Sequence, residues 1–261
     1  MKLISLNTWG GKIFEPLMDF IKNHSQDTDI FCFQEIYDTK SNIKTCRGIR
    51  ANLLSEIENI LPNFQEFYFP TKSGFDDNAV PVDFDLTYGL AIFVKNDIKI
   101  ISKKDFFIFK NDDTQPLKKD FSNLSTPLQY INFNTESKNF SVFNFHGTPF
   151  PGNKLDTKRR LLETERVKQI VDAENDSKIL IGDFNLLPHT ECIKIVENNM
   201  KNLIKEFQIE LTRSSLSPFY GKPEFQKYAD YAFTSKDIQI KNFQVPHLEI
   251  SDHLPMILEF S

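Results

Sequence analysis

Asp183 and Asn185 stand two residues apart, where the apolar segment Ile179 to Ile181 ends in Gly182. Side chains along a strand alternate between its two faces, so these two polar side chains would point to the same side. A carboxylate beside an amide can orient a water molecule and hold a metal ion or an oxyanion. The alternative is an ordinary turn after a strand, because Gly, Asp and Asn all favour turns.

Asp252 and His253 form a second polar pair, just before the last apolar segment of the chain. An Asp next to a His could bind a metal ion with one side chain and contact a phosphate with the other. His146 follows an apolar segment and precedes Gly147, and it could donate to a phosphate oxygen. For Asp252 and His253, the alternative is an Asp in a turn beside a surface His. For His146, the alternative is a core His whose ring nitrogens have partners within the fold.

Glu35 and Asn7 also end apolar segments. A buried Glu is rarely unpaired, so Glu35 needs a cation nearby, either a metal ion or the basic partner of a salt bridge. Asn7 adds an amide and is the weaker candidate by itself. Together, polar residues at the ends of several separate segments suit a metal–phosphate site, and no competing type of site is evident.

Strands must position these residues, because most of them adjoin short apolar or alternating segments. We expect strands at residues 2–7, 28–34, 64–69, 90–94, 98–109, 129–133, 139–145, 178–181, 229–234, 238–244 and 256–260, with 90–94 and 98–109 forming a hairpin. Helical spacing predicts helices near 14–21, 53–61, 154–173 and 191–200, and residues 71–87 and 111–127 should be long loops. This pattern predicts an α+β fold with sheets packed face to face and flanked by helices, in one domain over residues 1–261.

The composition limits the class of protein. The 261-residue chain is 40% hydrophobic and 26% charged, which is typical of a globular domain. Its net charge of −5 argues against a protein that coats nucleic acid through charge alone. Three cysteines suit neither a disulfide framework nor a zinc site. Residues 1–7 are too few and too polar for a signal peptide, and no apolar run reaches roughly 18–20 residues, so we expect a cytoplasmic protein without stable membrane insertion, with specialised export as the alternative. We also expect a monomer.

Taken together and in order, the motifs of this chain resemble the endonuclease/exonuclease/phosphatase superfamily, which includes pancreatic deoxyribonuclease, abasic-site endonucleases, inositol-phosphate 5-phosphatases, neutral sphingomyelinases and deadenylases. The motifs are Leu6-Asn7-Thr8-Trp9, Gln34-Glu35-Ile36, His146, Gly182-Asp183-Phe184-Asn185, Ala229-Asp230-Tyr231 and Ser251-Asp252-His253-Leu254-Pro255. The resemblance extends from residue 5 to residue 260. It implies a four-layer α/β/β/α sandwich of two mostly antiparallel sheets with helices outside.

The resemblance also implies a metal site. Glu35, with Asn7 close by, would hold Mg²⁺, for which Mn²⁺ could substitute, and Asp252 would share the ion directly or through water. Mg²⁺ prefers oxygen ligands and keeps several waters, which suits one or two carboxylates.

Catalytic roles follow from the same resemblance. Asp183 would orient and deprotonate the attacking water, with Asn185 fixing its position. His146 and His253 would donate to the phosphoryl oxygens of the transition state. Asp230 would pair with His253 and keep it cationic, because a neighbouring carboxylate favours the charged imidazole.

Four further residues are candidates for substrate binding: Arg47, Tyr88, Lys154 and Arg159. Tyr88 and Arg47 are candidates for the Tyr or Arg that several nuclease members place beside the phosphate. Lys154 and Arg159 belong to a basic cluster that, with Lys118 and Lys119, could line a track for a polyanion. The alternative is a solvated helix face whose charge is balanced by neighbouring Glu residues.

Three functions are compatible with these residues. We expect a nuclease that cleaves the phosphodiester bonds of nucleic acid. The alternative is a phosphatase or phosphodiesterase acting on small or lipid-derived phosphates, such as inositol phosphates or sphingomyelin. A non-catalytic binding module on the same scaffold is a third hypothesis, but it requires a missing catalytic residue, and none is missing.

Overall fold

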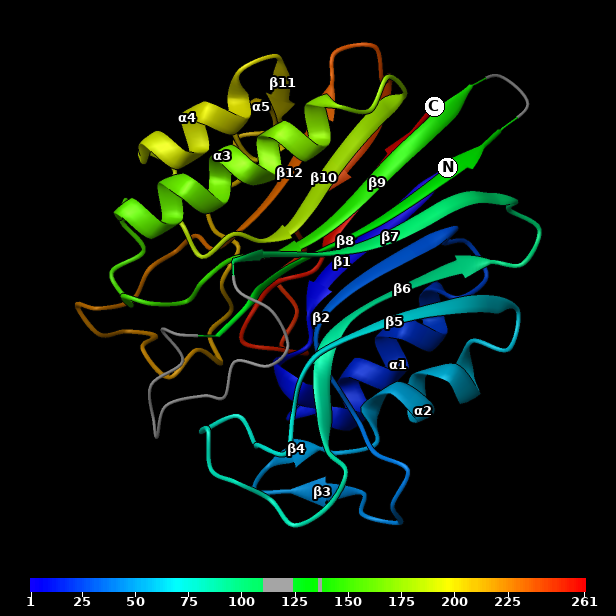
Figure 1. Cartoon of the computed structure of the whole chain (residues 1–261), viewed down its shortest axis with the longest axis vertical. Coiled ribbons are helices and arrows are strands. Elements are labelled where there is room, and N and C mark those ends of the chain that lie inside the picture. Colours follow the sequence, from blue (N-terminus) through cyan, green and yellow to red (C-terminus); the bar gives the residue numbers. More distant parts are fainter. Residues whose placement is uncertain (110–123, 136–137) are drawn as a thin grey trace.

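The computed structural model describes residues 1–109, 124–135 and 138–261, and in these residues two six-stranded sheets pack face to face (Figure 1). The first sheet has the strand order β13 (Ile240–Gln244), β14 (Met256–Phe260), β1 (Lys2–Asn7), β2 (Ile30–Asp38), β6 (Thr87–Lys95) and β5 (Phe64–Ser73). The second has the order β11 (Met200–Asn202), β12 (Asp230–Ser235), β10 (Ser177–Asp183), β9 (Asn139–His146), β8 (Thr126–Asn134) and β7 (Ile100–Phe109). A separate small pair consists of β3 (Thr45–Cys46) and β4 (Ile49–Arg50).

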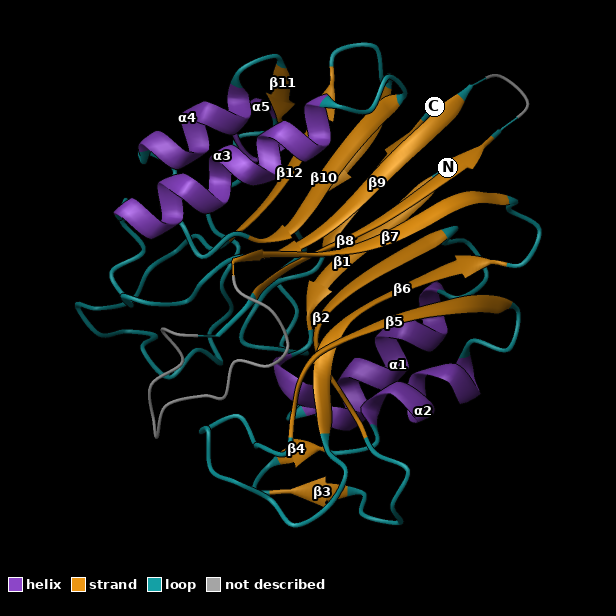
Figure 2. Cartoon of the chain, in the orientation of Figure 1, coloured by secondary structure: helices purple, strands orange, loops and turns teal. Residues whose placement is uncertain are grey.

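Helices cover the outer faces of both sheets (Figure 2). The first sheet carries α1 (Phe14–His24) and α2 (Leu53–Ile60), and the second carries α3 (Lys158–Asp172), α4 (Glu191–Glu197) and the short α5 (Leu203–Glu206). A 3-10 turn, η1 (Trp9–Gly11), follows β1. The apolar residues of α1 recur at helical spacing, so one face of this helix packs on the sheet. The four-layer α/β/β/α sandwich is thereby confirmed. No helix in the described part of the chain is long and apolar enough to cross a membrane.

Each sheet contains one parallel strand pair at its centre. β1 pairs in parallel with β2, and β9 pairs in parallel with β10, whereas the other neighbours are antiparallel. The carboxyl ends of parallel neighbours lie at the same edge of a sheet. The two sheets therefore bring Asn7, His146 and Asp183, the last residues of three of these strands, to one end of the sandwich.

A buried apolar layer holds the two sheets together. Leu3 and Ile92 from the first sheet belong to the same core cluster as Phe143 and Ile181 from the second, and all four are fully buried. Polar contacts also cross this layer, among them a pair of buried amides near the strand ends. Nε2 of Gln34 donates to Oδ1 of Asn144 over 2.6 Å, and both side chains are inaccessible to solvent.

Several predicted elements differ from the structure. The hairpin of residues 90–94 and 98–109 is wrong, because β6 belongs to the first sheet and β7 to the second. The helix predicted from residue 154 begins at Lys158, where the Thr157 side chain accepts a hydrogen bond from the Arg160 amide, and the helix predicted to reach residue 200 ends at Glu197. β5 extends to Ser73, into the predicted loop 71–87. Most of the predicted loop 111–127 lies outside the described residues.

Candidate active site

Asn7 joins the two sheets at the end where the central strands finish. Its Nδ2 donates to Oε1 of Glu35 over 3.2 Å and to Oδ2 of Asp183 over 3.0 Å. Its own Oδ1 accepts from the backbone of Trp9 at 3.0 Å. Residues from β1, β2 and β10 therefore meet around one amide, as the sequence analysis expected of Asn7, Glu35 and Asp183.

A bulge in β2 gives Glu35 its direction. The register with β6 shifts between Phe33 and Ile36, and Glu35 has a φ of 59°. Such a positive φ is uncommon for a residue with a side chain, and bulges next to active sites often redirect a side chain. The Glu35 side chain is one-quarter exposed, so it can be reached by a ligand.

The segment after β10 is built around close backbone packing. A Cβ at Gly182 would lie 2.1 Å from the carbonyl oxygen of Phe145, so only glycine fits there. The Asn185 backbone N–H then donates to Oδ1 of Asp183 at 2.9 Å, and its side-chain Nδ2 donates to the carbonyl of Gly147 at 3.1 Å. Asp183 and Asn185 are thus fixed relative to each other, and both are buried.

Asp183 lies among groups that favour its ionised form. Burial raises the pKa of this carboxyl, but His253, Lys154 and His146 outweigh that effect and bring the pKa to about 2. Nε2 of His146 is 3.7 Å from Oδ2 of Asp183, and Nε2 of His253 is 3.6 Å from the same oxygen. The carboxylate is therefore ionised at neutral pH and can accept a hydrogen bond from water.

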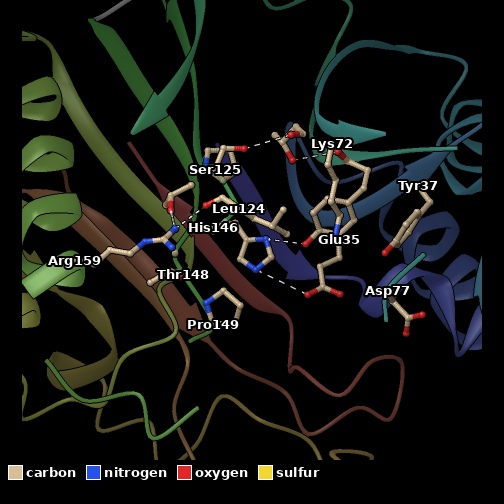
Figure 3. Close-up of a pocket in the computed structure, with 15 residues that line it drawn as sticks. Glu35, Tyr37, Lys72, Asp77, Leu124, Ser125, His146, Thr148, Pro149 and Arg159 are labelled. Atoms are coloured by element: carbon tan, nitrogen blue, oxygen red, sulfur yellow. Dashed lines mark hydrogen bonds and ion pairs between the residues drawn. The ribbon is translucent and has the colours of Figure 1, made fainter. Parts of the chain in front are cut away.

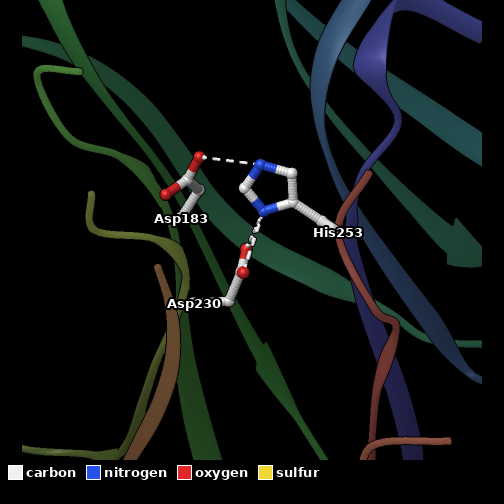
Figure 4. Close-up of side chains that lie close together, drawn as sticks. All are labelled: Asp183, Asp230 and His253. Carbon is white, nitrogen blue, oxygen red and sulfur yellow. Dashed lines mark hydrogen bonds and ion pairs between the residues drawn. The ribbon is translucent and has the colours of Figure 1, made fainter. Parts of the chain in front are cut away.

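His253 lies between Asp230 and Arg213. Figure 4 shows its side chain beside that of Asp230. Its Nδ1 lies 2.8 Å from Oδ2 of Asp230, and its Nε2 lies 2.7 Å from Nη1 of Arg213. A guanidinium only donates, so Nε2 is the acceptor and the imidazole carries its proton on Nδ1. Burial and the charge of Arg213 lower the pKa of His253 to about 4. The pairing with Asp230 is present. The contact with Arg213 leaves the imidazole of His253 neutral, whereas the resemblance implied a cationic one.

Arg213 was not among the predicted site residues. It lies in the segment between α5 and β12, forms a backbone bridge with His253, and donates through Nη2 to Oδ2 of Asp252 at 2.6 Å. No motif surrounds it in the sequence. The one available signal was general: several buried carboxylates need positive charge nearby.

The four candidates for substrate binding have different positions. The hydroxyl of Tyr88 is 3.3 Å from Nδ1 of His146, and Nζ of Lys154 donates to Oδ1 of Asn185 at 2.9 Å, so both adjoin the site. Arg159 pairs with Glu163 on α3 and lines the pocket described next. Arg47 is half exposed, pairs with Asp76 at 2.6 Å and does not line this pocket.

A pocket opens beside Glu35 and His146 (Figure 3). Polar and charged side chains form much of its wall, among them Tyr37, Lys72, Tyr88, Thr126 and Arg159. Its cavity measures about 120 Å³, below the roughly 300–1,000 Å³ typical of sites for drug-sized ligands, so it can enclose only a small group. Lys72, which the sequence analysis did not select, lies with Nζ 3.9 Å from the ring centre of Tyr88, and burial lowers its pKa to about 8.

The predicted basic track is not formed by the described residues. Arg160 is buried and donates to the backbone carbonyls of Thr148, Pro151 and Leu155, and Lys154 is buried as well. Lys118 and Lys119 lie outside the described residues. The basic residues that cluster in the sequence therefore do not share one exposed face.

The donor set around Asp183 suits a divalent cation. Ligand atoms of Asp183, Asp230 and His253 lie within 4.8 Å of one another, but both ring nitrogens of His253 already have partners. Oδ1 of Asp252 is buried and accepts no hydrogen bond within the described residues. This buried oxygen of Asp252 and the partly exposed carboxylate of Glu35 are oxygen ligands of the kind that Mg²⁺ prefers. The residues therefore fit such an ion.

Comparisons with known proteins agree with this fold. Residues 4–253 match the family model described as Endonuclease/Exonuclease/phosphatase family. Three similar solved structures each align with all of this chain. They are an endonuclease/exonuclease/phosphatase family protein from Leptotrichia buccalis (16% identity, 99% of that chain, TM-score 0.72), a mannosyl-6-phosphatase from Bacteroides thetaiotaomicron (18%, 99%, 0.69) and the human Nocturnin catalytic domain with bound sulfate (17%, 93%, 0.63).

A search of curated proteins gives no match. At identities this low, the similar structures show a shared fold, and the family model shows the family. The chain belongs to the endonuclease/exonuclease/phosphatase family, whose members are phosphoester hydrolases that typically depend on a divalent metal ion.

Proposed function

We propose that this phosphoesterase is a Mg²⁺-dependent hydrolase of small, polar phosphate esters. The observation that carries the proposal is the pocket beside Glu35 and His146, which has many polar and charged side chains in its wall and room for only a small group. The scissile phosphate would lie against Asp183 and His146, and the rest of the substrate would occupy this pocket. One similar structure is named a mannosyl-6-phosphatase, which agrees with a small substrate.

The proposed metal site consists of Glu35, Asn7 and Asp252. When bound, a divalent ion polarises the phosphoryl group and stabilises the charge that develops on it. Glu35 and Asp252 would supply carboxylate oxygens, and Asn7 would keep the Glu35 side chain in place through its 3.2 Å hydrogen bond.

The proposed chemistry is attack by water from the side of Asp183. A carboxylate with a pKa of about 2 is a weak base, so Asp183 acts mainly by accepting a hydrogen bond from the water and directing its lone pair at phosphorus. Asn185 holds Asp183 through its backbone N–H. His146, held by Tyr88, would donate to a non-bridging oxygen.

A nuclease, the function expected first from the sequence, is the second candidate here, and one observation favours it. Phe219 and Tyr220 are each about half exposed, in the same segment as Arg213. Exposed aromatic rings beside a phosphoesterase site can stack on the bases of a single strand. The net charge of −5 weighs against this function, and the pocket carries more of the argument.

The test is Mg²⁺-dependent hydrolysis of sugar phosphates, inositol phosphates, sphingomyelin, plasmid DNA and single-stranded RNA. Small esters should be hydrolysed, and chelator or Asp183→Ala should abolish the reaction. Ser125 lines the pocket, so Ser125→Trp would narrow the pocket. This variant should raise KM for the best small ester with little change in melting temperature. Faster cleavage of DNA or RNA than of every small ester would establish the nuclease instead, and Phe219→Ala with Tyr220→Ala should then weaken it.

A further inference from the structure

We propose that Lys154 is a substrate-binding residue whose ammonium group holds a non-bridging oxygen of the phosphoryl group. This assignment rests on the proposed hydrolysis of a phosphate ester. It is argued from the position of the lysine, from its hydrogen bonds and from the charges around it.

The backbone places Lys154 at one defined point beside the site. Its φ is 55°, its N–H donates to the carbonyl of Pro151 at 3.3 Å, and its own carbonyl accepts from the amide of Leu187 at 3.0 Å. Arg160 on α3 donates to carbonyl oxygens on both sides of it, of Pro151 at 2.8 Å and of Leu155 at 2.7 Å. Arg160 is thus a positioning residue for the segment that carries Lys154.

The ammonium of Lys154 is buried with donors to spare. The residue is 8% exposed, and its one hydrogen bond within the described residues goes to Oδ1 of Asn185 at 2.9 Å. An ammonium has three N–H donors, so two of them are available to a ligand. A buried ammonium with two unpaired donors would cost free energy if it served only to stabilise the fold, because buried polar donors usually have partners.

The neighbouring charges keep this lysine available for an anion. Burial and the charge of Arg213 lower the pKa of Lys154 to about 8, while the carboxylates of Asp183, Asp230 and Asp252 oppose this and favour its charged form. None of these carboxylates accepts a hydrogen bond from it within the described residues. Nζ is 2.9 Å from the amide oxygen of Asn185, and the backbone of Asn185 is bonded to Asp183. An oxygen of a phosphoryl group placed for attack by an Asp183-bound water is therefore within reach of Lys154.

A purely structural role would have different consequences. In that case Lys154 would only offset the negative charge of the carboxylates, and its loss would lower stability without changing the affinity for phosphate. A substrate-binding role predicts the reverse, because a charge-assisted hydrogen bond to the ligand is lost.

The experiment measures binding of inorganic phosphate by calorimetry, with Mg²⁺ present, together with hydrolysis of the best ester. Lys154→Gln keeps a neutral donor for Asn185 and removes the charge. Lys154→Arg keeps the charge. The matched control is Lys158→Met, an exposed lysine at the start of α3.

We expect Lys154→Gln to bind phosphate about tenfold or more weakly, with a similar loss in kcat/KM, and Lys154→Arg to recover part of both. Lys158→Met should match the wild type. Phosphate affinity within about twofold of the wild type in Lys154→Gln, with or without a lower melting temperature, would overturn the assignment while leaving the hydrolase function intact. A wild type that binds phosphate through Lys154 but hydrolyses no ester would refute the proposed function alone.

Discussion

Gln34 and Asn144 connect the two sheets directly beneath the active site. Nε2 of Gln34 donates to Oδ1 of Asn144 over 2.6 Å, and Nδ2 of Asn144 donates to the carbonyl of Phe33 over 3.0 Å. Gln34 precedes Glu35, and Asn144 lies two residues before His146. A buried amide pair is sensitive to geometry, because each unsatisfied donor or acceptor costs free energy. This pair therefore sets the position of Glu35 relative to His146.

Replacing Asn144 should affect both stability and activity. In Asn144→Leu, the amide of Gln34 loses its shortest hydrogen bond inside the core, so we expect the free energy of unfolding to fall by about 2 kcal/mol and kcat/KM to fall with it. Urea unfolding and ester hydrolysis measure the two effects. Asn139→Leu, at the exposed start of the same strand, is the control and should change stability by no more than about 0.5 kcal/mol. Equal effects of the two variants would remove any special role for the pair.

Mg²⁺ affinity should distinguish two possible ligand groups. One is the proposed group that contains Glu35, and the other is Asp183, Asp230 and His253. If Glu35 holds the ion, Glu35→Gln should weaken Mg²⁺ binding about tenfold or more. Asp230→Asn should leave the Mg²⁺ affinity within about threefold while lowering kcat, because Asp230 is bonded to His253. Calorimetric titration with Mg²⁺ in the absence of substrate gives both values. The opposite ranking would place the ion among Asp183, Asp230 and His253.

The protonation of His253 is a prediction that needs no substrate. Because Arg213 donates to Nε2, the metal-free protein at neutral pH should carry the His253 proton on Nδ1. Nitrogen-15 NMR distinguishes protonated from unprotonated ring nitrogens, and a His253→Gln sample assigns the signals. The exposed His247 serves as an internal reference for an imidazole in water. A protonated Nε2 at His253 would contradict the contact with Arg213.

Much of the fold could be predicted because many strands have a recognisable pattern of apolar or alternating residues. Residues 2–7 alternate between polar and apolar side chains and residues 178–181 form a short, mostly apolar run, and both are central strands in the structure. Strand pairing across the two sheets was not predictable in the same way. The turn between β6 and β7 has the length of a hairpin turn, but the chain changes sheets there, because burial of both strands against different partners outweighs local pairing.

The candidate site could be predicted only where chemistry and local pattern coincide. Asp183 ends β10 and Glu35 follows an apolar run, so the sequence pattern identified both, although Glu35 lies at a bulge within β2 and not at its end. Arg213 lies in an irregular segment, and its partners Asp252 and His253 are about 40 residues away in the chain. Lys154 was selected for the wrong reason, as part of an exposed basic track, since sequence spacing does not show that Arg160 turns this segment inward.

The affinity for an anion should decline above about pH 8 if Lys154 binds the substrate. Burial and the charge of Arg213 lower the pKa of this lysine from 10.5 to about 8, although the carboxylates of Asp183, Asp230 and Asp252 oppose them. The ammonium is therefore charged below that pH and neutral above it, so the affinity should fall by up to about tenfold per pH unit on the alkaline side.

Sulfate is the appropriate probe for this pH dependence, because its charge is constant across the range, whereas phosphate itself titrates. Calorimetry between about pH 7 and pH 10 should show the decline in the wild type. Lys154→Arg should bind sulfate with much less dependence on pH, because a guanidinium stays charged throughout this range. Lys158→Met should follow the wild type. An alkaline decline that persists unchanged in Lys154→Arg would have to come from another group, and the lysine would then not be the one that holds the anion.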